Sequence, residues 1–234
     1  MATIASAAYK DVPAESPLAG EVHKATGYGL MNGYNETTFG YQDSMTRAQF
    51  VTVLDRMMGW SSSMNEYRSV WYFPEAMEVP ETLPKAYLSA IEQAQARDVV
   101  NTAIAFRPSD PITRGEMAEM LVRALGLKGA AESLNSSQMP FSDAYSILHG
   151  QLPFTDLEYG NEGYIAVAYA IGMTNGTSAT TFSPERTATR GQAAAMLVRI
   201  YERQHRTNGK IHRIAVVAER TLWITSELLF AKAH

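Results

Sequence analysis

A six-residue stretch recurs three times in this chain, as Ser44-Met45-Thr46-Arg47-Ala48-Gln49, Pro111-Ile112-Thr113-Arg114-Gly115-Glu116 and Thr187-Ala188-Thr189-Arg190-Gly191-Gln192. Each copy has Thr-Arg, then a small residue, then Gln or Glu. Thr-x-x-Gln/Glu ahead of an apolar run is the capping-box signature, in which the Thr hydroxyl accepts a hydrogen bond from the amide three residues on. The pattern therefore predicts three helices that begin alike, with Thr46, Thr113 and Thr189 as caps. The Arg after each cap takes the first helical position, where a side chain usually points outward.

The residues before each copy repeat as well. A glycine lies 18 positions before the motif Arg in the first and third copies, and a Phe lies 8 positions before it in all three. These residues are Gly29, Gly172, Phe39, Phe106 and Phe182. Self-similarity along one chain dictates the architecture, so we predict three repeats over residues 1–60, 61–128 and 129–205. Residues 206–234 belong to no repeat. Their apolar spacing predicts an amphipathic helix that docks on the repeats or leads to a further domain, with a partner-binding helix as the alternative.

Each repeat is expected to hold two helices, which makes the fold class mainly all-α. Apolar spacing predicts first helices around residues 18–26, 84–97 and 163–170, and second helices over 50–58, 117–125 and 193–201. The Ser-, Asn- and Gly-rich segments 61–65 and 129–138 are interpreted as connectors. The middle loop, from Asp98 to Thr102, has no glycine, so we expect that it cannot form the same positive-φ turn at low cost. The repeated Phe residues and the Met-rich stripes are expected in the core.

The bulk composition excludes several classes of protein. The 234 residues are 46% hydrophobic, enough for a core, and the net charge of −4 gives no basic field for nucleic acid. The chain has no cysteine, which excludes disulfide scaffolds and cysteine-ligated metal sites. No run of about 18 apolar residues suggests a membrane span. The N-terminus lacks the features of a signal peptide, so an exported protein would be present here in mature form.

Residues that carry enzyme chemistry form no recognisable set. The five histidines, His23, His149, His205, His212 and His234, are scattered without metal-ligand spacing. No H-E-x-x-H, G-x-S-x-G or P-loop motif is present. Asp143 and Asp156 each follow an aromatic residue at a repeat opening, where a capping or turn role suffices. We therefore expect no catalytic site, no metal and no cofactor.

Taken together, these features resemble the S-layer homology family. The resemblance covers roughly residues 9–203 and rests on an aromatic-x-Asp opening, a helix, a glycine loop ending in Phe, and the Thr-Arg motif before a second helix. The openings are Tyr9-Lys10-Asp11 and Phe154-Thr155-Asp156. The resemblance implies that three repeats form one pseudo-threefold unit, with a central three-helix bundle, three prongs and grooves between the prongs. It also implies a noncatalytic anchor that binds secondary cell-wall polymer, often pyruvylated and linked to peptidoglycan, at the secreted, bacterial cell-wall or S-layer surface.

The resemblance places the ligand-binding residues at the motif and in the loop before it. The implied residues are Arg47, Arg114, Arg190, Gly33, Gly176, Gln49, Glu116, Gln192, Asp43 and Asp110. A helix N-terminus offers unpaired amides, and an Arg fork matches a carboxylate such as a pyruvate ketal, so both are expected to face the ligand. Tyr28, Tyr34, Tyr41 and Trp71 are candidate stacking surfaces for the sugar ring. The altered middle loop predicts fewer than three working grooves, with those of Arg47 and Arg190 favoured.

Other interpretations stay open. The motif arginines could simply pair with Asp43, Asp110 or Glu185. The chain could be a self-assembling surface-layer protein, or the anchor fragment of a larger cell-surface enzyme. A hydrolase that acts on wall polymer is a remote third alternative.

Overall fold

The computed structural model describes residues 9–60, 83–100, 106–134, 141–143 and 162–206. Over these residues the chain forms seven helices and only isolated β-bridges, so the all-α prediction is confirmed. The helices are α1 (Ala19–Gly27), α2 (Arg47–Met58), α3 (Lys85–Ala96), α4 (Arg114–Ala124), α5 (Lys128–Glu132), α6 (Glu162–Ala170) and α7 (Arg190–Arg206). The predicted tail helix, the connector 61–65, Trp71 and the Phe154 opening lie outside the described residues.

Six of the seven helices match the predicted pairs, and α5 is the exception. It lies in a segment that we interpreted as a connector, so that prediction is wrong for residues 129–132. Ala130 and Ala131 are good helix formers, and Ala131 is buried where its backbone meets Gly163 of α6. The glycine at 163 allows this approach, because an added Cβ there would overlap the Ala131 carbonyl. The Ser, Asn and Gly content of this segment therefore did not indicate α5, which is stabilised by packing against α6.

The capping boxes predicted at the three motif helices are all formed. The Thr46 side chain accepts from the Gln49 amide while the Gln49 side chain accepts from the Thr46 amide, and Thr113 and Glu116 repeat this arrangement. Thr189 and Gln192 exchange the same two bonds at 3.3 Å. Each box satisfies two backbone donors that would otherwise have no partner at the helix end. The Arg is the first helical residue each time, as predicted.

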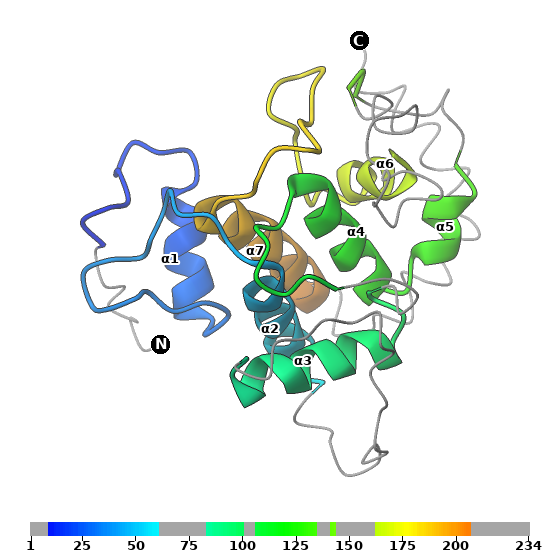
Figure 1. The fold of residues 1–234 in the computed structure, drawn as a ribbon. Coiled ribbons are helices and arrows are strands. Elements are labelled where there is room, and N and C mark those ends of the chain that lie inside the picture. The colour runs from blue at the N-terminus through cyan, green and yellow to red at the C-terminus, as the bar shows by residue number, and fades with distance from the viewer. Residues whose placement is uncertain (1–8, 61–82, 101–105, 135–140, 144–161, 207–234) are drawn as a thin grey trace.

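The motif helices lie at the middle of the molecule, and the first helices of the repeats lie around them (Figure 1). Helix α2 packs against both α4 and α7. Each motif helix pairs with the first helix of the following repeat: α2 with α3, α4 with α6, and α7 with α1. The last repeat therefore returns to the first. The prongs and grooves implied by the resemblance remain a prediction.

A closed ring of backbone hydrogen bonds joins the residues just before the caps. Met45 N donates to Ala188 O, Ala188 N to Ile112 O, and Ile112 N to Met45 O, at 3.3, 2.9 and 2.8 Å. All three side chains are fully buried. Isolated antiparallel bridges beside the ring connect Ser44 with Thr189, Thr46 with Pro111, and Thr113 with Thr187. The ring needs one contribution from every repeat.

The core follows the repeated apolar positions. Phe39, Phe106 and Phe182 are buried, as predicted, together with methionines of the motif helices such as Met117 and Met196. The largest fully buried side chains are Phe39, Phe50, Phe106, Phe141, Phe182, Met31, Met45, Leu54, Ile91, Ile112, Met117 and Leu121. They come from all three repeats and form one continuous cluster.

The turn after each first helix is the same in all three repeats, which corrects our expectation for the middle loop. Gly29, Asp98 and Gly172 all have positive φ, and the amide of the next residue reaches back to the last helical turn each time. Asp98 adopts a φ of 55°, a conformation that aspartate tolerates better than most residues. The lack of glycine therefore does not prevent the turn.

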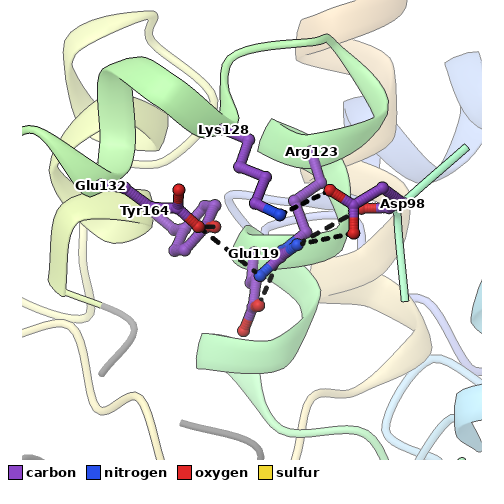
Figure 2. A network of polar contacts seen from close by, with 6 residues as sticks. All are labelled: Asp98, Glu119, Arg123, Lys128, Glu132 and Tyr164. Atoms are coloured by element: carbon purple, nitrogen blue, oxygen red, sulfur yellow. Dashed lines mark hydrogen bonds and ion pairs between the residues drawn. The ribbon is translucent and has the colours of Figure 1, made fainter. Parts of the chain in front are cut away.

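Polar contacts hold the Asp98 turn against the end of α4 and the start of α5, and Arg123 connects this network to α6 of the third repeat (Figure 2). Lys128 Nζ lies 2.6 Å from Asp98 Oδ2, and Arg123 Nη1 donates to the Asp98 carbonyl at 3.3 Å. Arg123 also pairs with Glu119 and lies over the Tyr164 ring of α6. Tyr164 in turn donates to Glu132 of α5 at 2.9 Å. The Asp98 side chain is 60% exposed, so its ion pairs contribute little and the network mainly orients the turn.

Candidate functional site

The amides at the start of each motif helix are occupied by backbone carbonyls of another repeat. Arg47 N donates to Asp110 O and Ala48 N donates to Pro108 O, both at 3.0 Å. The equivalent pairs are Arg114 N to Arg186 O, Gly115 N to Pro184 O, Arg190 N to Asp43 O, and Gly191 N to Tyr41 O. With the capping box, these bonds satisfy the whole first turn. Our expectation that helix-end amides face a ligand is therefore wrong.

The motif arginines point inward, although a side chain at the first helical position was expected to point outward. Their contact with a ligand stays a prediction. Arg47, Arg114 and Arg190 are 5%, 5% and 7% exposed. Each guanidinium donates from Nε to the carbonyl of a repeated Phe in another repeat: Arg47 to Phe106 O, Arg114 to Phe182 O, and Arg190 to Phe39 O, at 2.7–2.9 Å. Each also lies over the ring of the same Phe, 4.6–5.0 Å from its centroid. Each motif arginine therefore connects its own repeat to the next one through a hydrogen bond and a cation–π contact.

We call these contacts the first junction (Arg47 with residues 106–116), the second junction (Arg114 with residues 182–192) and the third junction (Arg190 with residues 32–49). In the first junction Arg47 Nη1 forms an ion pair with Glu116 Oε1. Arg107 lies 3.4 Å from the same carboxylate oxygen and 3.4 Å from Asp110. The motif Arg therefore does pair with an acidic residue here, but with Glu116 rather than with Asp43, Asp110 or Glu185 as the alternative had it.

The second junction leaves part of its guanidinium without a partner. Arg114 Nη2 is buried and has no hydrogen-bond acceptor among the described residues. Burial, and then the nearby charge of Arg186, lower the pKa of Arg114 to about 10, against the opposite effect of Asp143. The sequence favoured Arg47 and Arg190, whereas the structure leaves a terminal nitrogen unbonded at Arg114.

The third junction is closed around its guanidinium. Arg190 Nη2 donates to Asn32 O at 2.7 Å. Its guanidinium carbon lies 4.5 Å from the centroid of the Tyr34 ring and 5.0 Å from that of Phe39, so two rings flank it. Tyr34 is 54% exposed, which leaves it available to pack against a ligand. Its role as a sugar platform stays a prediction.

An aspartate in each of two repeats organises the loop that meets the arginine. Asp11 accepts hydrogen bonds from the amides of Phe39, Gly40 and Tyr41 at 2.7–2.8 Å. Burial raises the pKa of Asp11, but these amides outweigh that effect and hold the pKa below the usual aspartate range. Asp11 was not among the predicted site residues, although the aromatic-x-Asp opening of the repeat pointed to it.

Asp143 has the role of Asp11 in the third repeat, as its expected capping role implied. It accepts from the amides of Phe182 and Ser183 at 2.8 and 2.7 Å, and the Phe141 ring packs on Phe182 as Tyr9 packs on Phe39. Phe141 and Asp143 therefore make in the third repeat the contacts that Tyr9 and Asp11 make in the first. The opening predicted at residues 154–156 lies outside the described residues.

The predicted glycines are required by close packing. A Cβ on Gly33 would lie 2.5 Å from the Tyr9 ring and 2.8 Å from the carbonyl oxygens of Asn35 and Thr38. A Cβ on Gly176 would meet Phe141 at 2.6 Å and two backbone carbonyls at the same distance. Both glycines shape the loop next to a junction. Their direct contact with a ligand stays a prediction.

The remaining predicted residues have mainly structural surroundings. Gln49 and Gln192 form capping boxes, and Asp43 and Asp110 use their carbonyls as junction acceptors. Tyr41 is buried with its hydroxyl against Ser16. Tyr28 is exposed, stacks on Tyr201 and donates to Glu202 at 2.9 Å, so it links α1 to α7.

Two features are absent from the described part of the chain. None of its helices is long and apolar enough to cross a membrane. Its His, Asp and Glu side chains form no cluster of three or more with the arrangement of a metal site.

Comparison with known proteins identifies the family. The model of the S-layer homology domain matches residues 8–51, 79–118 and 153–194, together more than half of the chain, and the chain belongs to this family. It is 28% identical over 172 residues to an endoglucanase of Bacillus sp. (strain KSM-635), 25% identical over 179 residues to an amylopullulanase of Thermoanaerobacterium thermosulfurigenes, and 22% identical over 181 residues to the exoglucanase XynX of Acetivibrio thermocellus. The matches cover 72–75% of this chain but only 16%, 8% and 14% of those proteins.

Proposed function

We propose that this chain is a noncatalytic module that anchors a protein to the bacterial cell wall. The observation that carries the proposal is that one segment recurs in three relatives named for different enzymes. A segment common to an endoglucanase, an amylopullulanase and an exoglucanase, and under a fifth of each, suits a task that they share. The chemistry that distinguishes them would lie elsewhere in their chains. A secreted protein held at the cell wall or S-layer surface fits this task.

The ligand that we propose is a secondary cell-wall polymer, a polysaccharide linked to peptidoglycan and carrying pyruvate ketals. Because the helix-end amides are occupied, side chains would provide the recognition. The Arg114 guanidinium would offer its unbonded nitrogen to a ketal carboxylate, and the half-exposed Tyr34 would offer an aromatic surface to a sugar ring. The buried guanidinium favours a carboxylate over a neutral sugar, since an unpaired buried donor is costly and an anion relieves that cost.

Calorimetric titration tests this function. Purified peptidoglycan-linked polymer, and the same polymer after chemical removal of pyruvate, would each be titrated into the full chain. We expect binding to the first and markedly weaker binding to the second. Absence of binding to either would refute the anchoring function, whereas equal binding to both would refute only the role of the carboxylate.

A second candidate function, as the anchor part of a larger cell-surface enzyme, is favoured by the relatives' lengths. The chain spans less than a fifth of each of them. Immunoblotting of the native wall fraction tests this candidate, which requires a band well above 25.8 kDa. A band at that mass, together with self-association on a sizing column, would favour a self-assembling surface-layer protein instead.

A further inference from the structure

Asparagine followed by glycine occurs at equivalent places in the first and third repeats. Asn32-Gly33 and Asn175-Gly176 each stand 15 positions before a motif Arg, in the loop between the two helices of a repeat. A further pair, Asn208-Gly209, lies outside the described residues. Asn-Gly is the dipeptide in which an asparagine side chain reacts most readily with the backbone, because glycine has no Cβ to shield its nitrogen. The two described pairs therefore share one chemistry.

Both pairs can undergo a reaction that needs only water and a base to remove the glycine amide proton. The deprotonated nitrogen attacks the asparagine Cγ, a C–N bond forms, and the side-chain nitrogen takes a proton from solvent and leaves as ammonia. Water then opens the cyclic succinimide at either of its carbonyls. One product is aspartate, and the other is isoaspartate, whose backbone contains an additional CH2 group. In sum, an amide and water become a carboxylic acid and ammonia, and nothing is oxidised or reduced.

Several features of the surroundings are alike at the two pairs. Both asparagines are exposed, so water reaches both side chains. The Gly33 amide donates to the Tyr9 hydroxyl at 3.3 Å. The Gly176 amide donates to the Thr174 hydroxyl at 3.2 Å. Each glycine also lies against an aromatic ring, so neither the attacking nitrogen nor its packing distinguishes the pairs.

The hydrogen bond that the asparagine carbonyl receives is what differs. Arg190 Nη2 donates to Asn32 O at 2.7 Å, and this carbonyl belongs to the peptide group whose nitrogen must attack. The Arg190 side chain is buried, and its Nε also donates to Phe39 O at 2.9 Å. A short, charge-assisted hydrogen bond from a fixed group therefore holds the Asn32-Gly33 peptide in place.

The Asn175 carbonyl receives no hydrogen bond from the corresponding nitrogen of Arg114. This arginine meets the third repeat at Phe182 O, and its Nη2 has no acceptor among the described residues. The Thr174 hydroxyl that accepts from Gly176 belongs to the same turn, so it moves with the peptide. At the second junction the peptide therefore lacks the charged hydrogen bond that restrains its counterpart.

Closure of the succinimide ring requires the peptide group to rotate toward the side chain. A hydrogen bond that fixes the carbonyl slows this rotation, because it must break before the loop opens locally. We propose that Asn175-Gly176 is a site of spontaneous deamidation and backbone isomerisation in the folded protein, and that Arg190 protects the equivalent Asn32-Gly33. The structure thus separates two dipeptides that the sequence makes identical.

The product would change the second junction. Deamidation adds one negative charge to a formal net charge of −4. Isoaspartate lengthens the backbone next to Gly176, where an added Cβ would already lie 2.6 Å from the Phe141 ring. The same loop ends in Phe182, whose carbonyl accepts from Arg114. Accumulation of isoaspartate at residue 175 is therefore expected to lower the Tm of the aged protein.

Peptide mapping of the full chain after storage tests the assignment. The protein is kept for weeks in mildly alkaline buffer, folded in one sample and in concentrated urea in another. Tandem mass spectrometry locates the mass increase of deamidation, and enzymatic methylation measures isoaspartate. Because both pairs are Asn-Gly, they should react at similar rates in urea. In the folded chain we expect Asn32 to react at least about tenfold more slowly than Asn175, the factor that one charged hydrogen bond provides.

Two variants assign the effect to its residues. Asn175→Gln is the matched control, since glutamine keeps the amide but would have to close a larger, less favourable ring. It should abolish both the signal at residue 175 and the loss of Tm on storage. Arg190→Lys should accelerate the reaction at Asn32 and leave that at Asn175 unchanged, because lysine lacks the fork that reaches two carbonyls.

The opposite results would overturn the proposal. If Asn32 reacts as fast as Asn175 in the folded chain, or faster, the charged hydrogen bond stabilises the deprotonated amide more than it restrains the peptide. If Asn175 stays intact while the urea sample reacts fully, residue 175 is not a modification site of the folded protein. Equal acceleration of both pairs in Arg190→Lys would overturn the role of Arg190. An unchanged Tm after full reaction at residue 175 would overturn the effect on the second junction.

Discussion

Replacing Arg190 by alanine should destabilise the protein strongly, because this side chain joins the third repeat to the first. The substitution removes the donors to Phe39 O and Asn32 O, at 2.9 and 2.7 Å, and the stacking on Phe39 and Tyr34. Hydrogen bonds from a charged group contribute about 1.5–3 kcal/mol each, and cation–π contacts about 0.5–1 kcal/mol each. Loss of the guanidinium also removes its desolvation cost of several kcal/mol, so we expect a net loss of about 3 kcal/mol.

Urea unfolding followed by circular dichroism at 222 nm measures this loss. A change of about 3 kcal/mol corresponds to a fall in Tm of about 6–12 °C for a domain of this size. Arg190→Lys should recover less than half of the loss, because lysine keeps the charge but lacks the planar fork. The matched control is Arg186→Ala. Because this side chain is exposed, its removal should change the free energy of unfolding by less than about 0.5 kcal/mol.

A loss below about 0.5 kcal/mol in Arg190→Ala would refute the reasoning, since the guanidinium would then contribute no more than a surface residue. The expected result also has a practical meaning. Alanine variants of the motif arginines change folding and binding together, so they cannot isolate a ligand contact.

Further substitutions at Asp11, Gly33 and Asp98 test the loops, with Gly20 in α1 as a control position. Asp11→Asn should lower the free energy of unfolding by about 2 kcal/mol at pH 7, through loss of charged hydrogen bonds to three amides. Because the folded-state pKa of Asp11 is depressed, its contribution is complete above the unfolded pKa and is lost as pH falls through the folded one, so wild type and variant should converge in Tm at acidic pH. Gly33→Ala should lower the free energy of unfolding by about 1–3 kcal/mol in the same urea assay, because the added Cβ clashes with backbone atoms. Gly20→Ala should instead raise it by about 0.5–1 kcal/mol, because a Cβ there has no atom within 4 Å and alanine favours the helix α1. Asp98→Gly should leave Tm nearly unchanged, because relief of about 1 kcal/mol of left-handed strain offsets the exposed ion pairs, while Asp98→Ala should lower it.

Features that depend on neighbouring residues were predictable from the sequence. The Thr46 box needs only its own four residues, and the helix periods depend only on apolar spacing, so both follow from local physics. The spacing of Phe39 from Arg47 likewise marked a core position correctly. These local signals were enough to predict an all-α chain of three repeats.

Features that depend on another repeat were not predictable in this way. The position of Arg47 at the start of its helix predicts a side chain that points outward. In the structure, Phe106 of the next repeat covers this side chain. Asp98 was judged by its missing glycine, although the left-handed turn is accessible to aspartate.

The contact of Asp143 with the Phe182 loop was not predictable from spacing either. Asp11 lies 28 residues before Phe39, so the same spacing would not point to Asp143. The structure uses Asp143, 39 residues before Phe182. A longer connection adds little to the entropy of closure, so spacing alone is a weak guide.

The cyclic connection between repeats also sets a time order for folding during synthesis. Arg190 and its acceptor Phe39 are 151 residues apart. At about 5–20 residues per second, the ribosome needs roughly 8–30 s to add that length. During that interval α1 has no α7 to pack against. The junction carbonyls of the first repeat also lack hydrogen-bond donors, because the amides of the third repeat have not yet been synthesised. A chain interrupted before the third repeat would keep exposed the apolar side chains and backbone carbonyls of the first repeat that α7 would cover. Synthesis of α7 is therefore the step that buries this surface.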